Sequence, residues 1–313
     1  MTQIRAVVVD PEAEGRLVIR DVPAPVLAPS DALIRVSALS LNLGEVRRSR
    51  TAEAGWRPGW DLAGTVEQAA ADGTGPPVGT RVVGFVPAGA WAELVAVPTN
   101  ALADLPDAVS FAQAATLPVA GLTALYSLDR YGSLLNRTVL VTGASGGVGH
   151  LACQLARHGG ARVIASVRRR EREQIARDAG AHEVVSGDDP SVAEPFGPYH
   201  LILEAVGGAS LRASLSMLAP DGMCVLYGLS AATEATIDAR QFMTTGAARL
   251  YGFFLFHEVS RQPAAEGLAR LVDLVAQEHL RPRIEVEAPW TEIADTAGRL
   301  FDRGIAGKAV LHL

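Results

Sequence analysis

Four glycines in one short stretch could bring the backbone of this chain close to a phosphate group. They follow an apolar run at 139–141 and precede residues with helical spacing, at positions Gly143, Gly146, Gly147 and Gly149. Glycine permits a tight turn and a close approach to a pyrophosphate. The start of the following helix supplies unpaired N–H groups and a positive dipole end.

The stretch therefore predicts a dinucleotide site, with contacts from Ser145, Gly146, Gly147 and Val148. The strict GxGxxG pattern is not met, because alanine holds its first position. A plain strand-to-helix turn is the alternative.

A serine and three arginines follow the glycine stretch, at the position where a Rossmann unit holds the ribose of its nucleotide. In a unit that binds NAD, an acidic residue about 20 residues past the glycine loop accepts the ribose hydroxyls. The count reaches Ser166, and Arg168, Arg169 and Arg170 come next. Guanidinium groups suit a 2′-phosphate, so the segment predicts NADPH as cofactor. A solvated helix start is the alternative, and which of Arg168 and Arg169 contacts the phosphate is left open.

The elements around these residues alternate between strand and helix, which predicts a parallel sheet. We expect strands at 139–142, 162–167, 183–185, 200–204, 223–227 and 249–255, with helices at 171–179 and 264–278. A strand, a helix at 293–303 and a final strand follow. Residues 1–119 instead show short strand candidates separated by Pro and Gly, at 7–9, 17–19, 33–36, 64–66, 81–83 and 91–95. This pattern is typical of a small barrel-like β domain.

Composition narrows the class of protein. The 313 residues are 49% hydrophobic, enough for two domains, and a net charge of -6 argues against nucleic acid as a partner. Neither a signal peptide, a basic block for lipid nor an apolar run of membrane-spanning length is evident. We interpret Cys153 and Cys224 as reduced core residues of a cytoplasmic protein. Among 28 basic residues only Lys308 is lysine, which indicates a GC-rich, bacterial genome.

With these residues placed, the chain resembles the zinc-free quinone oxidoreductase (zeta-crystallin-like) branch of the medium-chain dehydrogenase/reductase superfamily. The resemblance rests on GWDLAGTV (59–66), VGTRVVGF (78–85), AATLPVAGLTAL (114–125), VTGASGGVG (141–149), EAVGG (204–208) and GIAGKAVL (304–311). It implies an α/β protein with two domains. A GroES-like β-barrel-type catalytic domain would contain residues 1–119 and 259–313. A doubly wound Rossmann domain would contain residues 120–258, and the active site would lie in the cleft between the two domains.

The resemblance also implies site residues. Asn42 matches an asparagine that the family places beside the substrate, and Thr123 matches a threonine near the nicotinamide. Arg47 stands where relatives often have a tyrosine, so the proton donor is open. Arg47 could stabilise an enolate or bind an acidic substrate, or lie in solvent. Further cofactor contacts are expected from Val206, Gly228, Phe253 and Lys308, of which Lys308 could equally lie at the surface.

A catalytic zinc is not expected. The histidine that zinc-dependent relatives place after the first glycine of the 59–61 motif is here Trp60, and cysteine is missing before Cys153. Reduction of a quinone or an enone needs no metal, because a hydride reaches the activated carbon and donors need only stabilise the carbonyl oxygen. The aromatic residues Trp56, Trp60, Trp91, Phe253 and Phe254 could line a pocket for a flat substrate or belong to the core.

These features predict an NADPH-dependent reductase of quinones or α,β-unsaturated carbonyls. One alternative is a trans-acting enoyl reductase of polyketide or lipid synthesis, and another is an NADPH-binding regulatory protein with little turnover. The apolar, aromatic-rich segment 249–256 at the sheet edge predicts a homodimer, since an open apolar edge invites association.

Overall fold

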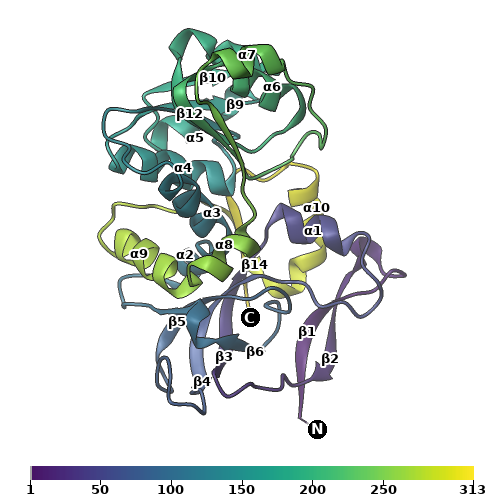
Figure 1. Ribbon diagram of the computed structural model, residues 1–313. Helices are drawn as coiled ribbons and strands as arrows, with labels where there is room; N and C mark the ends of the chain where they lie inside the picture. The colour runs from purple at the N-terminus through teal and green to yellow at the C-terminus, as the bar shows by residue number, and fades with distance from the viewer. Residues whose placement is uncertain (1) are drawn as a thin grey trace. The chain divides into compact units, whose positions relative to one another are not determined.

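A computed structural model describes residues 2–313 of the chain (Figure 1). The chain forms two compact units. The first contains the residues up to 122 together with 259–313, and the second contains residues 123–258. In Figure 1 the first unit is therefore purple, blue and yellow, whereas the second is teal and green.

The first unit is built mainly on antiparallel strands, and only β14 and β15 among the paired strands of its main sheet run parallel. Its main sheet has the order β14-β15-β3-β4-β5-β7, and β6 also pairs with β3, while β1 and β2 form a separate ribbon. The strands are β1 (Gln3–Val9), β2 (Leu17–Pro23), β3 (Asp31–Ser40), β4 (Asp61–Gln68), β5 (Arg81–Phe85), β6 (Leu94–Pro98), β7 (Leu102–Asp104), β14 (Ile284–Pro289) and β15 (Lys308–His312). The chain's last strand thus lies beside a strand from its beginning, which explains why the first unit needs both ends.

Alternation of side chains builds the core of this unit. In β3 the apolar residues Ile34 and Val36 are buried, whereas Arg35 between them is exposed. Period-two alternation of this kind gives one face to the core and one to solvent. Trp91 is fully buried in the same core and lies against the β1 ribbon, where its carbonyl accepts from the N–H of Val7.

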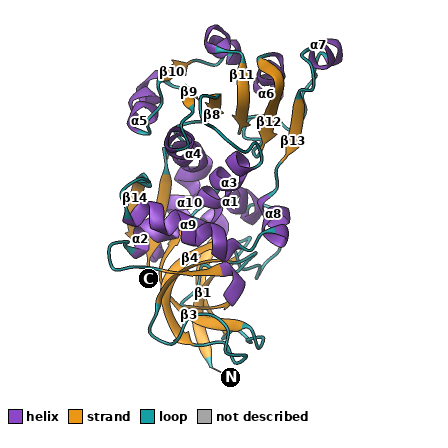
Figure 2. Ribbon diagram, turned by 60° about the vertical axis from the view of Figure 1, so that its left-hand side comes forward, coloured by secondary structure: helices purple, strands orange, loops and turns teal. Residues whose placement is uncertain are grey.

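The second unit is a parallel sheet of six strands in the order β10-β9-β8-β11-β12-β13, and Figure 2 shows them in this order from left to right. The strands are β8 (Thr138–Thr142), β9 (Arg162–Val167), β10 (Glu183–Ser186), β11 (Tyr199–Glu204), β12 (Leu218–Leu226) and β13 (Arg249–Gly252). Counted from β8, this order is 3-2-1-4-5-6, the Rossmann order. The predicted α/β fold with a GroES-like and a Rossmann domain is confirmed.

The helices are short. They are α1 (Leu43–Ser49), α2 (Phe111–Ala115), α3 (Pro118–Asp129), α4 (Gly147–His158), α5 (Glu173–Asp178), α6 (Gly208–Ser216), α7 (Ala239–Thr244), α8 (Leu255–Arg261), α9 (Ala264–Ala276) and α10 (Ile293–Phe301). Short 3-10 segments occur at Glu14–Arg16, Thr99–Ala101, Arg170–Arg172, Pro190–Phe196 and Trp290–Glu292. Within residues 2–313, none of the helices has the length and apolar character needed to cross a bilayer.

Three of the predicted strands illustrate how the expected bounds differ from the structure. The strand expected at 249–255 ends at Gly252, and helix α8 begins at Leu255. The strand expected at 223–227 begins already at Leu218 and passes through Asp221, whose φ is positive. The strand expected at 91–95 begins only at Leu94, because the backbone of residues 91 and 92 pairs with strand β1 instead.

Candidate active site

The glycine stretch forms a tight turn between β8 and α4. Gly143 has a φ of 62°, and its carbonyl accepts from the N–H of Gly146 at 2.9 Å. A Cβ atom on Gly149 would lie 2.4 Å from the Gly143 oxygen, so only glycine allows α4 to pack this closely against the turn. The residue before α4 is Gly146, which offers no side-chain cap. The first N–H groups of α4 are thus left for a ligand.

The end of β9 lies next to this turn. Ser166 is the register partner of Thr142 at the end of β8, and its carbonyl accepts from the N–H of Ala144 at 3.1 Å. Arg168 and Arg169 follow directly and are exposed. Within the described chain, 2–313, neither guanidinium has a hydrogen bond or an ion pair. Two cations at the carboxyl end of this strand therefore lack an acidic partner.

The end of β10 closes this side of the sheet. The hydroxyl of Ser186 donates to Oε1 of Glu173 at 2.6 Å. That hydrogen bond, with a further contribution from Arg177, lowers the pKa of Glu173. Ser186 is thus engaged with helix α5.

The loops after β11 and β12 are bonded to each other. Val206 accepts at its carbonyl from the N–H of Ala231, and a Cβ on Gly228 would lie 2.8 Å from the Ala205 oxygen. Beneath the first loop, the buried carboxylate of Glu204 accepts from the N–H groups of Val206 and Gly207 at 2.8 and 3.0 Å. Its other oxygen accepts from two serine hydroxyls of α6, Ser210 and Ser214. Glu204 therefore fixes the backbone around Val206.

The structure therefore brings most predicted cofactor residues to one edge of the parallel sheet. Ser145, Ser166, Arg168, Val206 and Gly228 all lie at or just after the carboxyl ends of strands, where Rossmann sheets bind ligands. Phe253 follows β13 on the same edge and is buried, with its N–H bonded to Leu226. Thr123, on α3, is also nearly fully buried.

The predicted residues of the first unit meet in a buried polar cluster. The ammonium of Lys308 lies 2.6 Å from Oδ1 of Asn42, 3.0 Å from the carbonyl of Leu41 and 3.2 Å from Oδ2 of Asp61. Asp61 also accepts from the hydroxyl of Ser40 and from the N–H of Val119 at the start of α3. Lys308 is only 4% exposed, so the alternative that it lies at the surface is wrong.

Asn42 uses its whole carboxamide in this cluster. Its Nδ2 donates to Oδ2 of Asp61 at 2.8 Å and to Oε1 of Glu45 at 3.0 Å, while its oxygen accepts from Lys308. An amide nitrogen carries two hydrogens, so both are engaged. Asn42 is thus held rigidly at the start of α1.

Glu45 is a second fully buried acid of this cluster, beside Asp61. Its Oε1 accepts from the backbone N–H of Asn42, and its Oε2 has no hydrogen-bond partner within residues 2–313. Burial raises the pKa of Glu45 well above its ordinary value, and the charge of Asp61 adds to this, whereas Lys308 opposes it. The cluster therefore favours a neutral Glu45 beside the Lys308–Asp61 ion pair.

Arg47 lies on the exposed side of α1, among other arginines. Its neighbour Arg48 stacks over the ring of Trp56 at 4.7 Å. Trp60 takes the place of the zinc ligand of relatives and packs on the backbone of α1, since a Cβ on Gly44 would lie 2.9 Å from its ring. In the described chain, 2–313, histidine, cysteine and acidic side chains form no group of three or more arranged to hold a metal.

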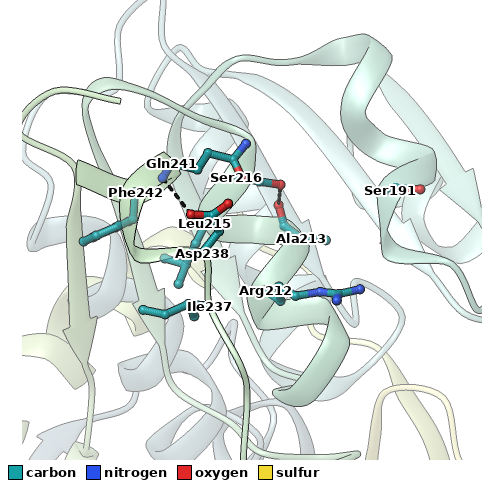
Figure 3. Close-up of a pocket in the computed structure, with 9 residues that line it drawn as sticks. All are labelled: Ser191, Arg212, Ala213, Leu215, Ser216, Ile237, Asp238, Gln241 and Phe242. Atoms are coloured by element: carbon teal, nitrogen blue, oxygen red, sulfur yellow. Dashed lines mark hydrogen bonds between the residues drawn. The ribbon is translucent and has the colours of Figure 1, made fainter. Parts of the chain in front are cut away.

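A separate surface cavity of about 230 Å³ opens in the second unit, beside α6 and α7 (Figure 3). Asp238 caps α7 at its rim by accepting from the N–H of Gln241, and Leu215 and Phe242 contribute apolar surface. None of the predicted site residues lines it.

Comparison with known proteins agrees with this fold. The family described as alcohol dehydrogenase GroES-like domain matches residues 28–107, and the family described as zinc-binding dehydrogenase matches residues 147–273. A quinone oxidoreductase from Pongo abelii is 27% identical over 307 residues, covering 94% of this chain and 92% of that protein. A mycobacterial protein solved in complex with NADPH has a TM-score of 0.88 and 28% identity, and the match covers 99% of this chain and 100% of that one.

A third relative is a mycocerosic acid synthase-like polyketide synthase from Mycobacterium tuberculosis, 31% identical over 214 residues. The match covers 64% of this chain and 10% of that protein. The chain belongs to the medium-chain dehydrogenase/reductase superfamily, in its quinone oxidoreductase branch. It is accordingly an oxidoreductase.

Sequence reasoning missed the roles of Glu45, Asp61 and Glu204. Asp61 and Glu204 lie inside recognised motifs, but nothing in the sequence showed what their carboxylates bind. The sequence held one signal for the buried cluster. Lys308 is the single lysine among 28 basic residues, which indicates that this position requires an ammonium group and not a guanidinium group.

Proposed function

We propose that this protein is an NADPH-dependent oxidoreductase that reduces quinones or activated C=C bonds of α,β-unsaturated carbonyls by direct hydride transfer, without a metal. The choice of NADPH as cofactor is supported by the residues at the end of β9. Ser166 stands there in place of the acidic residue of NAD-binding proteins, and the guanidinium groups of Arg168 and Arg169 lack protein partners. A 2′-phosphate supplies the anion that these guanidinium groups lack.

The residues of the second unit fit such a cofactor. In the turn at 143–149 a Cβ on Gly149 would collide with the backbone of Gly143, so glycine keeps the turn tight and lets the backbone lie close to a pyrophosphate. Ser145, Gly146, Gly147 and Val148 would hold that group at the start of α4. Val206, Gly228, Phe253 and Thr123 would contact the remainder of the cofactor. When bound, NADPH supplies a hydride to the substrate.

The protein's further task is to stabilise negative charge on the substrate oxygen. We assign this to Arg47, an exposed residue of α1, and assign substrate positioning to Asn42. Lys308 was expected at the cofactor. Because its three N–H groups are directed to acceptors, we assign it instead to holding Asn42 in place.

An enoyl reductase that acts in trans on a carrier-bound substrate is the second candidate. It is supported by the 31% identity to part of a polyketide synthase. A regulatory protein that binds NADPH with little turnover is the third reading.

Turnover distinguishes these proposals. We expect steady NADPH oxidation, followed by absorbance, with a simple quinone or a small enone. Turnover restricted to carrier-bound enoyl thioesters would favour the second candidate. NADPH binding in calorimetry without turnover of any of these substrates would contradict the proposed enzyme.

A further inference from the structure

Arg57 is a partly buried cation without a protein partner. It precedes the Pro58-Gly59-Trp60-Asp61 segment, and its Nε is buried without a hydrogen-bond partner. Within residues 2–313 it forms no ion pair either. Burial alone lowers the pKa of Arg57, with no acid to oppose the effect.

Other partly buried arginines of the same unit are satisfied. Arg16 donates to the carbonyls of Ser49 and Ala52, and Arg81 donates to the carbonyls of Pro106 and Val109. Buried charged groups are ordinarily paired or hydrogen-bonded, because an unpaired one destabilises the fold. The contrast indicates that Arg57 is retained for something other than stability.

The backbone that carries Arg57 is rigid. Gly59 has a φ of 110°, and a Cβ there would lie 2.4 Å from the nitrogen of Trp91. The carbonyl of Gly59 accepts from the N–H of Ala90 at 3.0 Å, and the carbonyl of Trp56 accepts from the N–H of Val9 at 2.9 Å. Arg57 is thus presented by a fixed segment, as a binding residue should be.

The same segment packs against the start of α1. Asp61 bonds to Asn42, and the ring of Trp60 lies against Gly44. Arg57 therefore belongs to the segment that meets the substrate-side residues assigned above. Helix α1 carries Arg47 and Arg48, and its one acid, Glu45, is buried.

We propose that Arg57 binds an oxyanion of the substrate, either a carboxylate or a phosphate, so that the preferred substrates are unsaturated carbonyl compounds that carry an acidic group. This inference rests on the proposed reductase function and deepens it. A guanidinium offers paired donors that match either oxyanion. The phosphate case corresponds to the arm of a coenzyme A or carrier-bound substrate.

The test compares three α,β-unsaturated carbonyl probes with NADPH: trans-acetylacrylate, its neutral methyl ester, and crotonyl-CoA. The variants are Arg57→Met, Arg57→Lys and, as a matched loss of one positive charge, Arg35→Gln, whose guanidinium pairs with Glu67 on the surface. We expect Arg57→Met to lower kcat/KM by about 10- to 100-fold for the probe that carries the recognised oxyanion, and to leave the ester nearly unchanged.

Dependence of acetylacrylate on Arg57 identifies a carboxylate, and dependence of crotonyl-CoA alone identifies a phosphate. Arg57→Lys should recover part of the loss, and Arg35→Gln should behave as wild type. Equal effects of Arg57→Met on the acid and its ester would overturn the inference while leaving the reductase intact. Failure of wild type to reduce any probe or quinone would instead remove the proposed function.

A measurement without turnover completes the test. Acetylacrylate or coenzyme A should raise the Tm of wild type and not that of Arg57→Met. The substitution itself should leave Tm unchanged or raise it, because it removes an unpaired buried charge. A marked fall in Tm would show that Arg57 is structural and would overturn the inference.

Discussion

The Nζ atom of Lys308 lies 2.6 Å from Oδ1 of Asn42, a residue 266 positions earlier in the chain. The other two acceptors around this ammonium are the Leu41 carbonyl and Asp61. An ammonium carries three hydrogens on one compact centre, so all three are matched. A planar guanidinium could not reproduce this arrangement.

Loss of Lys308 should destabilise the first unit strongly. Lys308→Met leaves Asp61 buried without its countercharge, and removal of one partner from a buried ion pair costs about 3–5 kcal/mol. We expect Lys308→Arg to be destabilising as well, because the guanidinium is too large for the site. Urea unfolding measures both changes. The exposed Arg281→Met serves as the control, and equal stability of the Lys308 and Arg281 variants would contradict the prediction.

The stability of the protein should depend on the protonation of Glu45. Its pKa is raised in the folded state, so the folded protein binds this proton more tightly than the unfolded chain does. The contribution is therefore fully present below the unfolded pKa and is lost as the pH rises through the folded pKa. Glu45→Gln cannot ionise, so its Tm relative to wild type should increase with pH. Calorimetry between about pH 5 and about pH 9 checks this, and a Tm difference that does not change with pH would refute it.

Cofactor preference should depend on Arg168 and Arg169. Replacing both with alanine should raise the KM for NADPH about 10- to 100-fold and leave NADH nearly unchanged, since a charge-assisted contact contributes about 1.5–3 kcal/mol. Arg170→Ala removes a neighbouring exposed charge and is the matched control. Steady-state kinetics with both cofactors gives the answer, and an equal loss for NADPH and NADH would show that this turn is wrongly assigned.

Ser166→Asp should reverse that preference. The new carboxylate would accept from the ribose hydroxyls of NADH and repel the 2′-phosphate of NADPH. The ratio of kcat/KM values for the two cofactors measures the change. An unchanged ratio would mean that Ser166 does not face the ribose.

Purified protein should contain no stoichiometric zinc, and chelators should leave its activity unchanged. The basis is the side chain at the ligand position, since Trp60 cannot coordinate a metal and packs against α1. Elemental analysis and activity after chelation are the measurements. About one zinc per chain would be incompatible with this prediction.

The protein should form a homodimer through the edge of its parallel sheet. Strand β13 ends that sheet, and it exposes Leu250, which is 43% accessible, while the nearby Phe254 is 64% accessible. An open apolar edge tends to pair with another chain. Light scattering at micromolar concentration should show twice the chain mass, and Leu250→Arg should shift it towards one chain. A wild-type monomer would disprove the assignment.

The regular elements of the second unit could be predicted because each strand is a short apolar run bounded by glycine or charge. The bounds of β9 were predicted correctly, at Arg162 and Val167. The expected strand at 249–255 began at the right residue, but its end was wrong, because a run of apolar residues does not by itself distinguish a strand from a helix. Here the run continues into α8, whose first residue, Leu255, is buried.

The buried cluster was beyond sequence reasoning because its members are far apart in the chain. Ser40 ends β3, Asp61 begins β4, and Lys308 begins β15, and these three strands are neighbours in the sheet. Their pairing brings Asp61 and Lys308 to the start of α1, where Asn42 and Glu45 lie. Such proximity depends on the pairing of distant strands, which periodicity and motifs do not reveal. The site loops of the second unit, by contrast, follow local sequence patterns.

The burial of Lys308 also determines how this protein can be labelled. It is the chain's only lysine, so amine-reactive dyes and cross-linkers find no side chain to modify on the surface. The thiols offer no substitute, because Cys153 and Cys224 are both buried and burial raises the pKa of Cys153 to about 12. Covalent capture of a dimer or a carrier-bound substrate therefore calls for carboxylate chemistry or for an introduced cysteine, whose thiol would be accessible where the two native thiols are not.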